Sequence, residues 1–385
     1  MKRREKNLLK KLKREKGITL VALVITIVIL IILATVTINV AFGERGLIER
    51  AQQAKNLTEQ ATRNEQEGLN SLMSEYANII AEGPEVPEPE PVVNEVDPEP
   101  EPEPGNPVIG EDVTGGSKFE NITTVEDGEG NEVTIPGGFE LAPDTGTKVE
   151  EGIVIQDSNG NQFVWIPVGT YQTSSGAKTN NLSRRTFTSS GATEVSVNSE
   201  LQDGSTYTFY GEENPGSIAY NQIQGFKDSA TSHGGFYIGR YEQGTGNVCK
   251  AGINPYVDIT RDQAKTQAEA IYSGNSYVTS ELISSYAWDT ALNFICQTNS
   301  AGYTLATTTS SSYGNIDTEN KTLTGNYEKD KYSNIFDFLG NCYEWTTEYC
   351  NHGSMSWVTR GGRCITIGNY AAYRNASWTP TPRYK

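Results

Sequence analysis

The distribution of apolar residues divides the chain into a membrane-directed front and a globular rear. Residues 18–43, from Ile18 to Gly43, form a run of 26 residues without a charged side chain. As a helix this run would be about 39 Å long at about 1.5 Å per residue. A hydrocarbon core of about 30 Å is crossed by that length with some tilt. The pattern therefore predicts a transmembrane helix over 18–43.

Residues 44–82 are polar, with apolar residues at helical spacing. The clearest set follows the i, i+3, i+4, i+7 rule and consists of Leu69, Leu72, Met73, Tyr76, Ile79 and Ile80. Such a set covers one face of a helix. We expect an amphipathic helical stem over 44–82 that continues the membrane helix.

Composition changes abruptly after Glu82. Residues 83–107 contain nine prolines, and eleven acidic but no basic residues lie from Glu82 to Asp112. Proline fixes φ and lacks an amide donor, and the like charges repel one another. Such a segment cannot bury enough apolar surface to fold. We predict a disordered Pro/Glu linker over 83–117 and a head domain over 118–385, with its core over 150–385.

Within the head domain, the pattern mixes strand and helix periods and predicts an α+β fold. Two hairpins are expected, over Val125–Ile135 and Ile153–Val168, the second with a tight turn at Asn159-Gly160. The pair Thr260 and Gln263 is a capping-box sequence, which predicts a helix from Thr260 to about Tyr272.

A second helix is expected over Ser284–Thr298. Its apolar stripe consists of Trp288, Ala291, Leu292 and Ile295, which share one helical face.

Charge orients the membrane helix. The leader, residues 1–17, has nine Lys or Arg and two Glu, a net charge of +7. The whole chain carries −17, so the part beyond Gly17 carries −24. Because positive charge marks the cytoplasmic side, we expect a single-pass protein of the cell membrane with an extracellular head. The acidic excess argues against nucleic acid as a partner.

The cysteine count is odd, so complete intramolecular pairing is excluded. The five cysteines are Cys249, Cys296, Cys342, Cys350 and Cys364. We expect free or partly paired small apolar residues.

The junction Gly17-Ile18 resembles the processing site of type IV prepilins, since a basic leader ends in glycine and an apolar helix follows. The resemblance implies cleavage by a prepilin peptidase, a methylated Ile18 and contact with pilin assembly machinery. Ala22 stands where the class usually has glutamate, which leaves filament assembly open. An ordinary uncleaved anchor remains the alternative.

The head also resembles a known family. The segments concerned occur in this order: FVWIPVG at 163–169, GGFYIGRYEQG at 234–244, SYAWDTALNFI at 285–295, NIFDFLGNCYEWTTEY at 334–349 and VTRGG at 358–362. Together they resemble the formylglycine-generating-enzyme family, also called sulfatase-modifying-factor-like. The resemblance covers nearly all of 152–385 and implies a variant of the C-type lectin fold.

The resemblance implies a structural calcium ion around residues 337–344. Asp337 and Glu344 would supply carboxylates, and Gly340 and Cys342 would supply carbonyl oxygens. Hard oxygen donors suit calcium. A solvated turn with two unrelated carboxylates is the alternative.

Catalysis is the less favoured use of this head. Oxidase members of the family use two cysteines after the RGG-like motif to bind copper, and this chain has only Cys364 there. Iron-dependent relatives need a histidine cluster, whereas His233 and His352 are far apart in sequence. A copper- or iron-dependent oxidase with an atypical site stays open as an alternative.

Binding of an extracellular ligand, a protein or a glycan, is the favoured function. The tail supplies aromatic, Arg and Asn side chains of the kind that dominate recognition surfaces. The candidate ligand-binding residues are Tyr370, Tyr373, Arg374, Asn375 and Trp378. The family's closing Gly-Phe-Arg strand is not found, which leaves two interpretations open: the last core strand is lost, or the protein is truncated. A structural minor pilin without a ligand is a further alternative.

Overall fold

The computed structural model describes residues 105–195, 198–200, 207–316, 320–353, 356–365 and 370–377. The predicted leader, transmembrane helix and stem and most of the predicted linker lie outside the described residues, as do Gly17 and Ile18. Among the described residues, no helix has both the length and the apolar character needed to cross a membrane.

The domain is α+β, and its strands pair antiparallel. One sheet has the order β12 (Gly235–Gly239), β5 (Gln162–Pro167), β4 (Val154–Gln156), β3 (Glu140–Leu141). The other has the order β10 (Asn198–Glu200), β11 (Thr208–Tyr210), β13 (Glu344–Cys350), β14 (Trp357–Arg360), β15 (Asn375–Ser377). Three two-stranded hairpins join β1 (Thr123–Glu126) to β2 (Glu132–Ile135), β6 (Gly169–Tyr171) to β7 (Lys178–Asn180), and β8 (Arg185–Thr188) to β9 (Gly191–Glu194).

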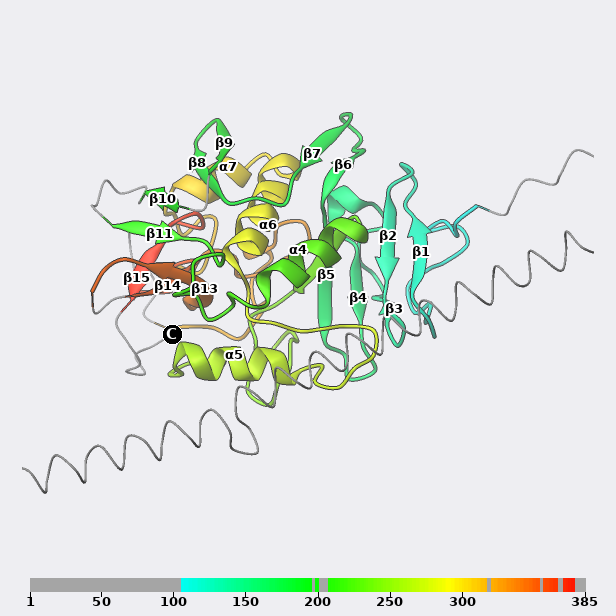
Figure 1. Cartoon of the computed structure of the whole chain (residues 1–385). Coiled ribbons are helices and arrows are strands. Elements are labelled where there is room, and N and C mark those ends of the chain that lie inside the picture. The colour runs from blue at the N-terminus through cyan, green and yellow to red at the C-terminus, as the bar shows by residue number, and fades with distance from the viewer. Residues whose placement is uncertain are drawn as a thin grey trace, which may run out of the picture. The chain divides into compact units, whose positions relative to one another are not determined.

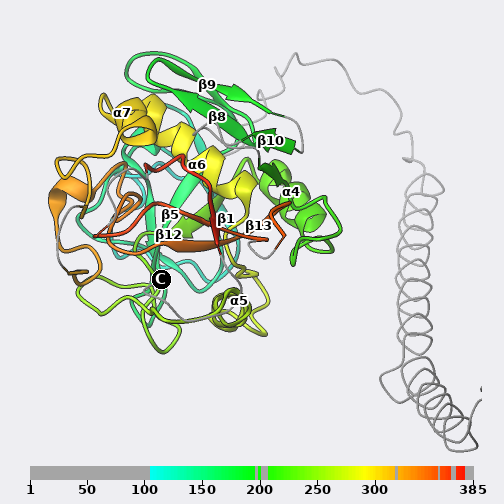
Figure 2. The ribbon, with the colours of Figure 1, turned by 90° about the vertical axis from the view of Figure 1, so that its left-hand side faces the viewer.

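The helix α6 lies between the two larger sheets and contacts β5 and β13 (Figure 1). The described helices are α4 (Ile223–Ser232), α5 (Arg261–Ala270), α6 (Ser285–Thr298) and α7 (Gly302–Thr307), with short 3-10 turns at Val149–Glu151 and Glu328–Asp330. The second view places α5 on the opposite side of the domain from α7 and the β8–β9 hairpin (Figure 2).

Both predicted helices are confirmed. The Thr260 hydroxyl accepts from the Gln263 amide at 3.1 Å, and the Gln263 side chain accepts from the Thr260 amide at 2.8 Å. This reciprocal cap starts α5 at the expected residue. Ser284 caps α6 by accepting from the Ala287 amide at 3.1 Å. The whole apolar stripe of α6 is buried.

Both predicted hairpins are confirmed, and an aspartate holds each turn. Asp157 Oδ1 accepts from the amides of Asn159 and Asn161. Asp127 does the same for Glu129 and Asn131 in the first hairpin. The amides in the turn cannot all bond to the opposite strand, and the aspartate side chain accepts their hydrogen bonds instead. The hairpin β1–β2 belongs to the same core as β4 and β5, so that core begins before residue 150.

The predicted boundary between the linker and the head domain is wrong. Residues 107–117, assigned to the linker, bond to the domain: the Ile109 amide donates to Glu126 O at 2.7 Å and the Gly116 amide donates to Leu141 O at 2.8 Å. The side chain of Ile109 is buried, which offsets the ordering cost. At the other end of the described chain, β15 pairs with β14 through Val358 and Ala376.

Candidate functional site

The segment 337–344 makes a tight reversal before β13. Asp337, Gly340 and Asn341 all have positive φ, at 56°, 93° and 53°. The Gly340 amide donates to Gly361 O at 2.7 Å. A Cβ on Gly361 would lie 2.1 Å from Glu344 Oε2. Gly361 therefore allows a close approach between the chain after β14 and the start of β13.

This reversal buries carboxylates that lack sufficient donors. Asp337 is 1% exposed; its Oδ2 accepts from the Gly325 amide at 2.9 Å, while Oδ1 has no hydrogen-bond partner among the described residues. Glu344 Oε2 is likewise buried without a partner in the described structure. A buried oxygen left in this state is costly unless a donor or cation reaches it.

A third carboxylate joins them, which our sequence analysis missed. Glu242 follows β12 and accepts from the Cys342 amide at 2.9 Å and from Asn341 Nδ2 at 2.6 Å. It ties the segment after β12 to the reversal before β13. The signal was available, since Glu242 is the acidic residue of the segment GGFYIGRYEQG.

The electrostatics of this group favour a positive partner. Burial raises the pKa of Asp337 to about 6. Burial, and then repulsion by Asp337, raises the pKa of Glu242 well above its ordinary value. Burial and the charges of Glu242 and Asp337 do the same for Glu344. Asp330, which neighbours Asp337, has its pKa raised to about 7, first by burial. The charged forms are mutually unfavourable without a cation.

These three carboxylates line a large cavity. Its volume is about 840 Å³, and its walls come from β5, β12, α4, α5 and α6 together with the loop 277–284. Aromatic side chains are prominent in the lining and include Phe163, Trp165, Tyr237, Tyr272, Trp288 and Trp345. A mainly apolar concavity that also contains polar groups is typical of a ligand site.

Of the four residues expected to bind calcium, two would do so through their side chains. Asp337 and Glu344 both have an unpartnered, buried oxygen, which fits a hard cation in charge and donor type. In the described part of the chain, no three His, Cys, Asp or Glu side chains gather as a metal-binding group. The expected set contains two carboxylates and completes its shell with the carbonyls of Gly340 and Cys342. The chemistry of these donors is therefore compatible with calcium.

Tail residues fall into three environments. Tyr370 and Tyr373 are half-buried and meet edge to face, with centroids 5.5 Å apart. Asn375 donates to Thr359 Oγ1 at 3.1 Å across the β14–β15 pair. Trp378 lies outside the described residues.

Arg374 does not belong to a binding surface, and its assignment there is corrected. It is 2% exposed and pairs with Asp289, while its Nε donates to Glu348 Oε1 at 2.8 Å. Isolated burial of a guanidinium would be costly, so these two carboxylates fix its position. Its alternation with aromatic residues in the sequence gave no sign of this.

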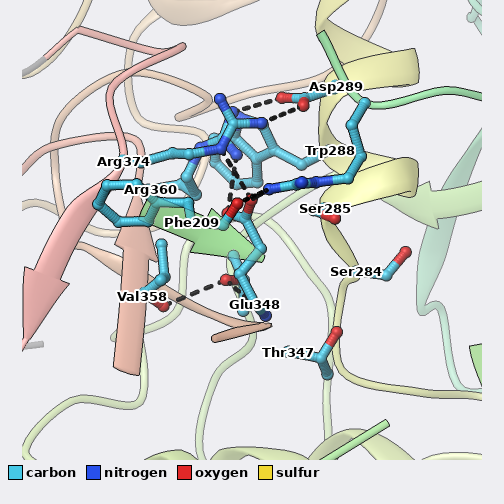
Figure 3. A network of polar contacts seen from close by, with 12 residues as sticks. Phe209, Ser284, Ser285, Trp288, Asp289, Thr347, Glu348, Val358, Arg360 and Arg374 are labelled. Atoms are coloured by element: carbon cyan, nitrogen blue, oxygen red, sulfur yellow. Dashed lines mark hydrogen bonds and ion pairs between the residues drawn. The ribbon is translucent and has the colours of Figure 1, made fainter. Parts of the chain in front are cut away.

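Arg374 is part of a buried ion network that joins distant segments (Figure 3). Arg360 contacts Glu348 at 3.0 Å and Asp289 at 2.5 Å, and Arg184 contacts Glu348 at 2.9 Å. Burial disfavours the charged form of Glu348, but the three guanidiniums hold its pKa below the ordinary range. The network is fully enclosed and therefore serves the fold.

Comparison with family models, with curated proteins and with solved structures found no match for this chain.

Two cysteines, Cys342 and Cys364, belong to segments that contact each other. The Cys364 amide donates to the carbonyl oxygen of Asn341, the residue before Cys342, at 3.0 Å. Both thiols are buried. Burial raises the pKa of each, and the nearby Glu242 carboxylate raises both further. These surroundings favour thiols over thiolates, which are the reactive form.

Proposed function

We propose that this chain is a pilin-like, membrane-stemmed surface protein whose head binds an extracellular ligand without transforming it. We further propose that the head is a sulfatase-modifying-factor-like variant of the C-type lectin fold. The cavity of about 840 Å³ is the observation that supports binding best. A protein or glycan ligand would reach it with a side chain or a chain end.

Calcium is the cation that the resemblance implies, and it would have a structural role. Asp337 and Glu344, with the carbonyls of Gly340 and Cys342, would hold it. It would neutralise the carboxylates and fix the reversal before β13. Bound calcium should raise the melting temperature of the full-length protein, and that gain should disappear in Asp337→Asn.

The binding proposal is tested by tryptophan emission. Trp165, Trp288 and Trp345 line the cavity, so an occupant should alter the fluorescence of the full-length protein in detergent. A panel of small aromatic molecules would be titrated against wild type and Ala268→Leu. Ala268 lies on α5, is buried and lines the cavity, so leucine would fill part of the space.

Ala270→Leu is the matched control, because Ala270 is on the same helix but exposed. Binding that is lost in Ala268→Leu and kept in Ala270→Leu supports the proposal. A panel in which no compound binds, or in which both variants bind like wild type, contradicts it.

The stem is tested separately by mass spectrometry of the mature N-terminus. A first residue Ile18, methylated, supports prepilin processing, and an intact Met1 supports an ordinary anchor. Loss of filaments on deletion of the protein, with no ligand found, would support the minor-pilin alternative.

The oxidase alternative uses Cys364 as the ligand of an atypical metal site. It requires stoichiometric copper or iron and oxygen consumption with a cysteine-containing peptide. Metal analysis of the purified full-length protein, before and after Cys364→Ser, measures this directly.

A further inference from the structure

The strand β12 is the edge of its sheet, and its outer side has no strand partner. The sheet order places β12 at one end, beside β5. At the opposite end, the segment 116–118 covers β3: the Gly116 amide donates to Leu141 O at 2.8 Å, and the Leu141 amide donates to Ser117 O at 3.1 Å. Among the described residues, no segment pairs with the outer side of β12 in this way. The chain thus closes one edge of this sheet and leaves the other open.

The register of β12 on β5 shows which backbone groups face outward. The Val168 amide donates to Gly234 O at 2.8 Å, and the Arg240 amide donates to Gln162 O at 3.0 Å. Because alternate residues of an antiparallel pair exchange hydrogen bonds, the even-numbered residues of β12 bond to β5. The N–H and C=O groups of the odd-numbered residues therefore point away from the sheet. We call these residues the free edge of β12; they are Gly235, Tyr237 and Gly239.

The cavity of about 840 Å³ passes around this free edge. Side chains of a strand alternate between the two faces of a sheet. From β5, only Phe163 and Trp165 line the cavity, and both lie on one face, whereas all five residues of β12 line it. The cavity therefore lies over one face of the sheet at β5 and reaches around the edge at β12. The free edge is part of its wall.

The chemistry of the free edge selects the occupant. Its N–H and C=O groups recur about every 6.8 Å and have no hydrogen-bond partner among the described residues. Backbone groups that are shielded from bulk water are costly to leave unpaired. An extended peptide carries complementary groups at the same repeat, and peptides add to open sheet edges in this way. A glycan has hydroxyl groups that lack this repeat.

The charge of the lining restricts the peptide further. Among the described residues that line the cavity, Glu242, Glu281, Asp337 and Glu344 are acidic and none is Lys or Arg. A structural cation at the turn before β13 would still leave Glu281, on the loop 277–284, without a basic residue in this lining. Acidic side chains in the peptide are therefore disfavoured.

We propose that this cavity binds an extended peptide segment without acidic residues, which adds as a further strand to the free edge of β12. The inference rests on the proposed binding function and deepens it, because it names a peptide and not a glycan as the ligand. Backbone hydrogen bonds to Tyr237 and its odd-numbered neighbours hold the peptide. One row of peptide side chains faces the aromatic lining.

Peptides that differ only in backbone methylation test the pairing. The probe is an acetylated and amidated peptide of alternating valine and threonine between terminal lysines. It would be titrated against the full-length protein in detergent by calorimetry. Successive amides of an extended chain face opposite sides, so only the valine set or only the threonine set can face β12. We expect N-methylation of one set to weaken binding at least about tenfold and N-methylation of the other to change it little. Equal effects of the two methylated isomers, or an unmethylated probe that does not bind, would overturn the inference.

Tyr237→Pro and Tyr237→Ala form a matched pair in the protein. Both remove the ring, which packs 5.0 Å from that of Trp165 between centroids, but only proline also removes the outward N–H. Proline is tolerated at an edge position whose N–H does not bond to the sheet. We expect Tyr237→Pro to bind the probe peptide at least about tenfold more weakly than Tyr237→Ala. Equal affinity of the two variants contradicts strand addition. If Tyr237→Pro does not fold, the methylated peptides on the wild-type protein decide alone.

Further ligands separate this inference from the proposed function. Glutamates in place of the terminal lysines should weaken the probe peptide, and equal binding would overturn the restriction on charge. Chitotetraose, the glycan probe, should bind more weakly than the peptide, and the reverse order would contradict a peptide ligand. If small aromatic molecules bind but the peptide does not, strand addition fails and the cavity remains a binding site. If none of these ligands binds, the proposed function fails as well.

Discussion

At the scale of single residues, the buried carboxylates and the glycines that surround them decide the character of the site. Glu242, Asp337 and Glu344 are held near one another by backbone amides and by close packing against Gly361. Their raised pKa values mean that the folded domain stabilises the protonated forms. The folded domain therefore disfavours having all three carboxylates charged at once.

The pH dependence of stability should reveal this. The pKa of Asp337 rises from 3.8 to about 6 in the folded domain. The folded state thus binds this proton more tightly than the unfolded state, and the free energy of unfolding falls as the pH rises from about 4 to about 6. The loss should be roughly 3 kcal/mol from this residue.

Urea unfolding at pH 4 and at pH 7 measures the effect. Asp337→Asn cannot titrate, so it should gain stability relative to wild type between these pH values. If the two proteins differ in unfolding free energy by the same amount at pH 4 and at pH 7, the raised pKa does not belong to Asp337.

Substitution of Gly361 should be much more damaging than that of a comparable glycine. Gly361→Ala combines a φ of 79° with a Cβ only 2.1 Å from Glu344 Oε2. We expect a loss of about 2–4 kcal/mol in chemical denaturation. Gly246→Ala has a φ of 87° but open space around the Cβ, so it should lose only about 1 kcal/mol. Equal losses would show that backbone conformation alone explains the cost.

At the scale of elements, local signals predicted α5, α6 and two hairpins. Thr260, Ser284 and the turn aspartates form their hydrogen bonds with residues two to four positions away. Such local patterns can be recognised in the sequence. The carboxylate group was predicted only in part, since Glu242 meets the reversal before β13 from a distant segment. The role of Arg374 was missed because its partners, Asp289 and Glu348, are also distant along the chain.

The cap of α5 gives a prediction at this scale. Thr260→Ala removes the hydroxyl that accepts from the Gln263 amide and should cost about 0.5–2 kcal/mol of unfolding free energy. Thr266→Ala, at an exposed position of the same helix, should be neutral or slightly stabilising because alanine has the higher helix propensity. The comparison requires only thermal or urea unfolding of the two variants.

At the scale of the whole molecule, the ion network fastens the domain together. Asp289 lies on α6, Glu348 on β13 and Arg360 on β14, while Arg184 and Arg374 come from loop segments. Trp288 adds a bond from α6 to the tail by donating to Ala371 O at 3.0 Å. Segments that are far apart in sequence are thus joined around one enclosed cluster of charges.

Removing one member should destabilise the whole domain. Arg374→Met leaves Asp289 and Glu348 with fewer positive partners in a dry interior, at a cost of about 3–5 kcal/mol. The neighbouring Asn375→Ala loses one hydrogen bond at the sheet edge and should cost about 1 kcal/mol. Differential scanning calorimetry would distinguish the two, and a mild effect of Arg374→Met would show that the network contributes little.

The order of these charges along the chain has a consequence for synthesis. During translation, Arg374 and strand β15 emerge only after Asp289 and Glu348, the two carboxylates that Arg374 neutralises. A partly synthesised domain therefore lacks one of the cations of its buried network and should be less stable than the finished one. Truncated products that end before Arg374 should be degraded faster by an added protease than molecules that contain it.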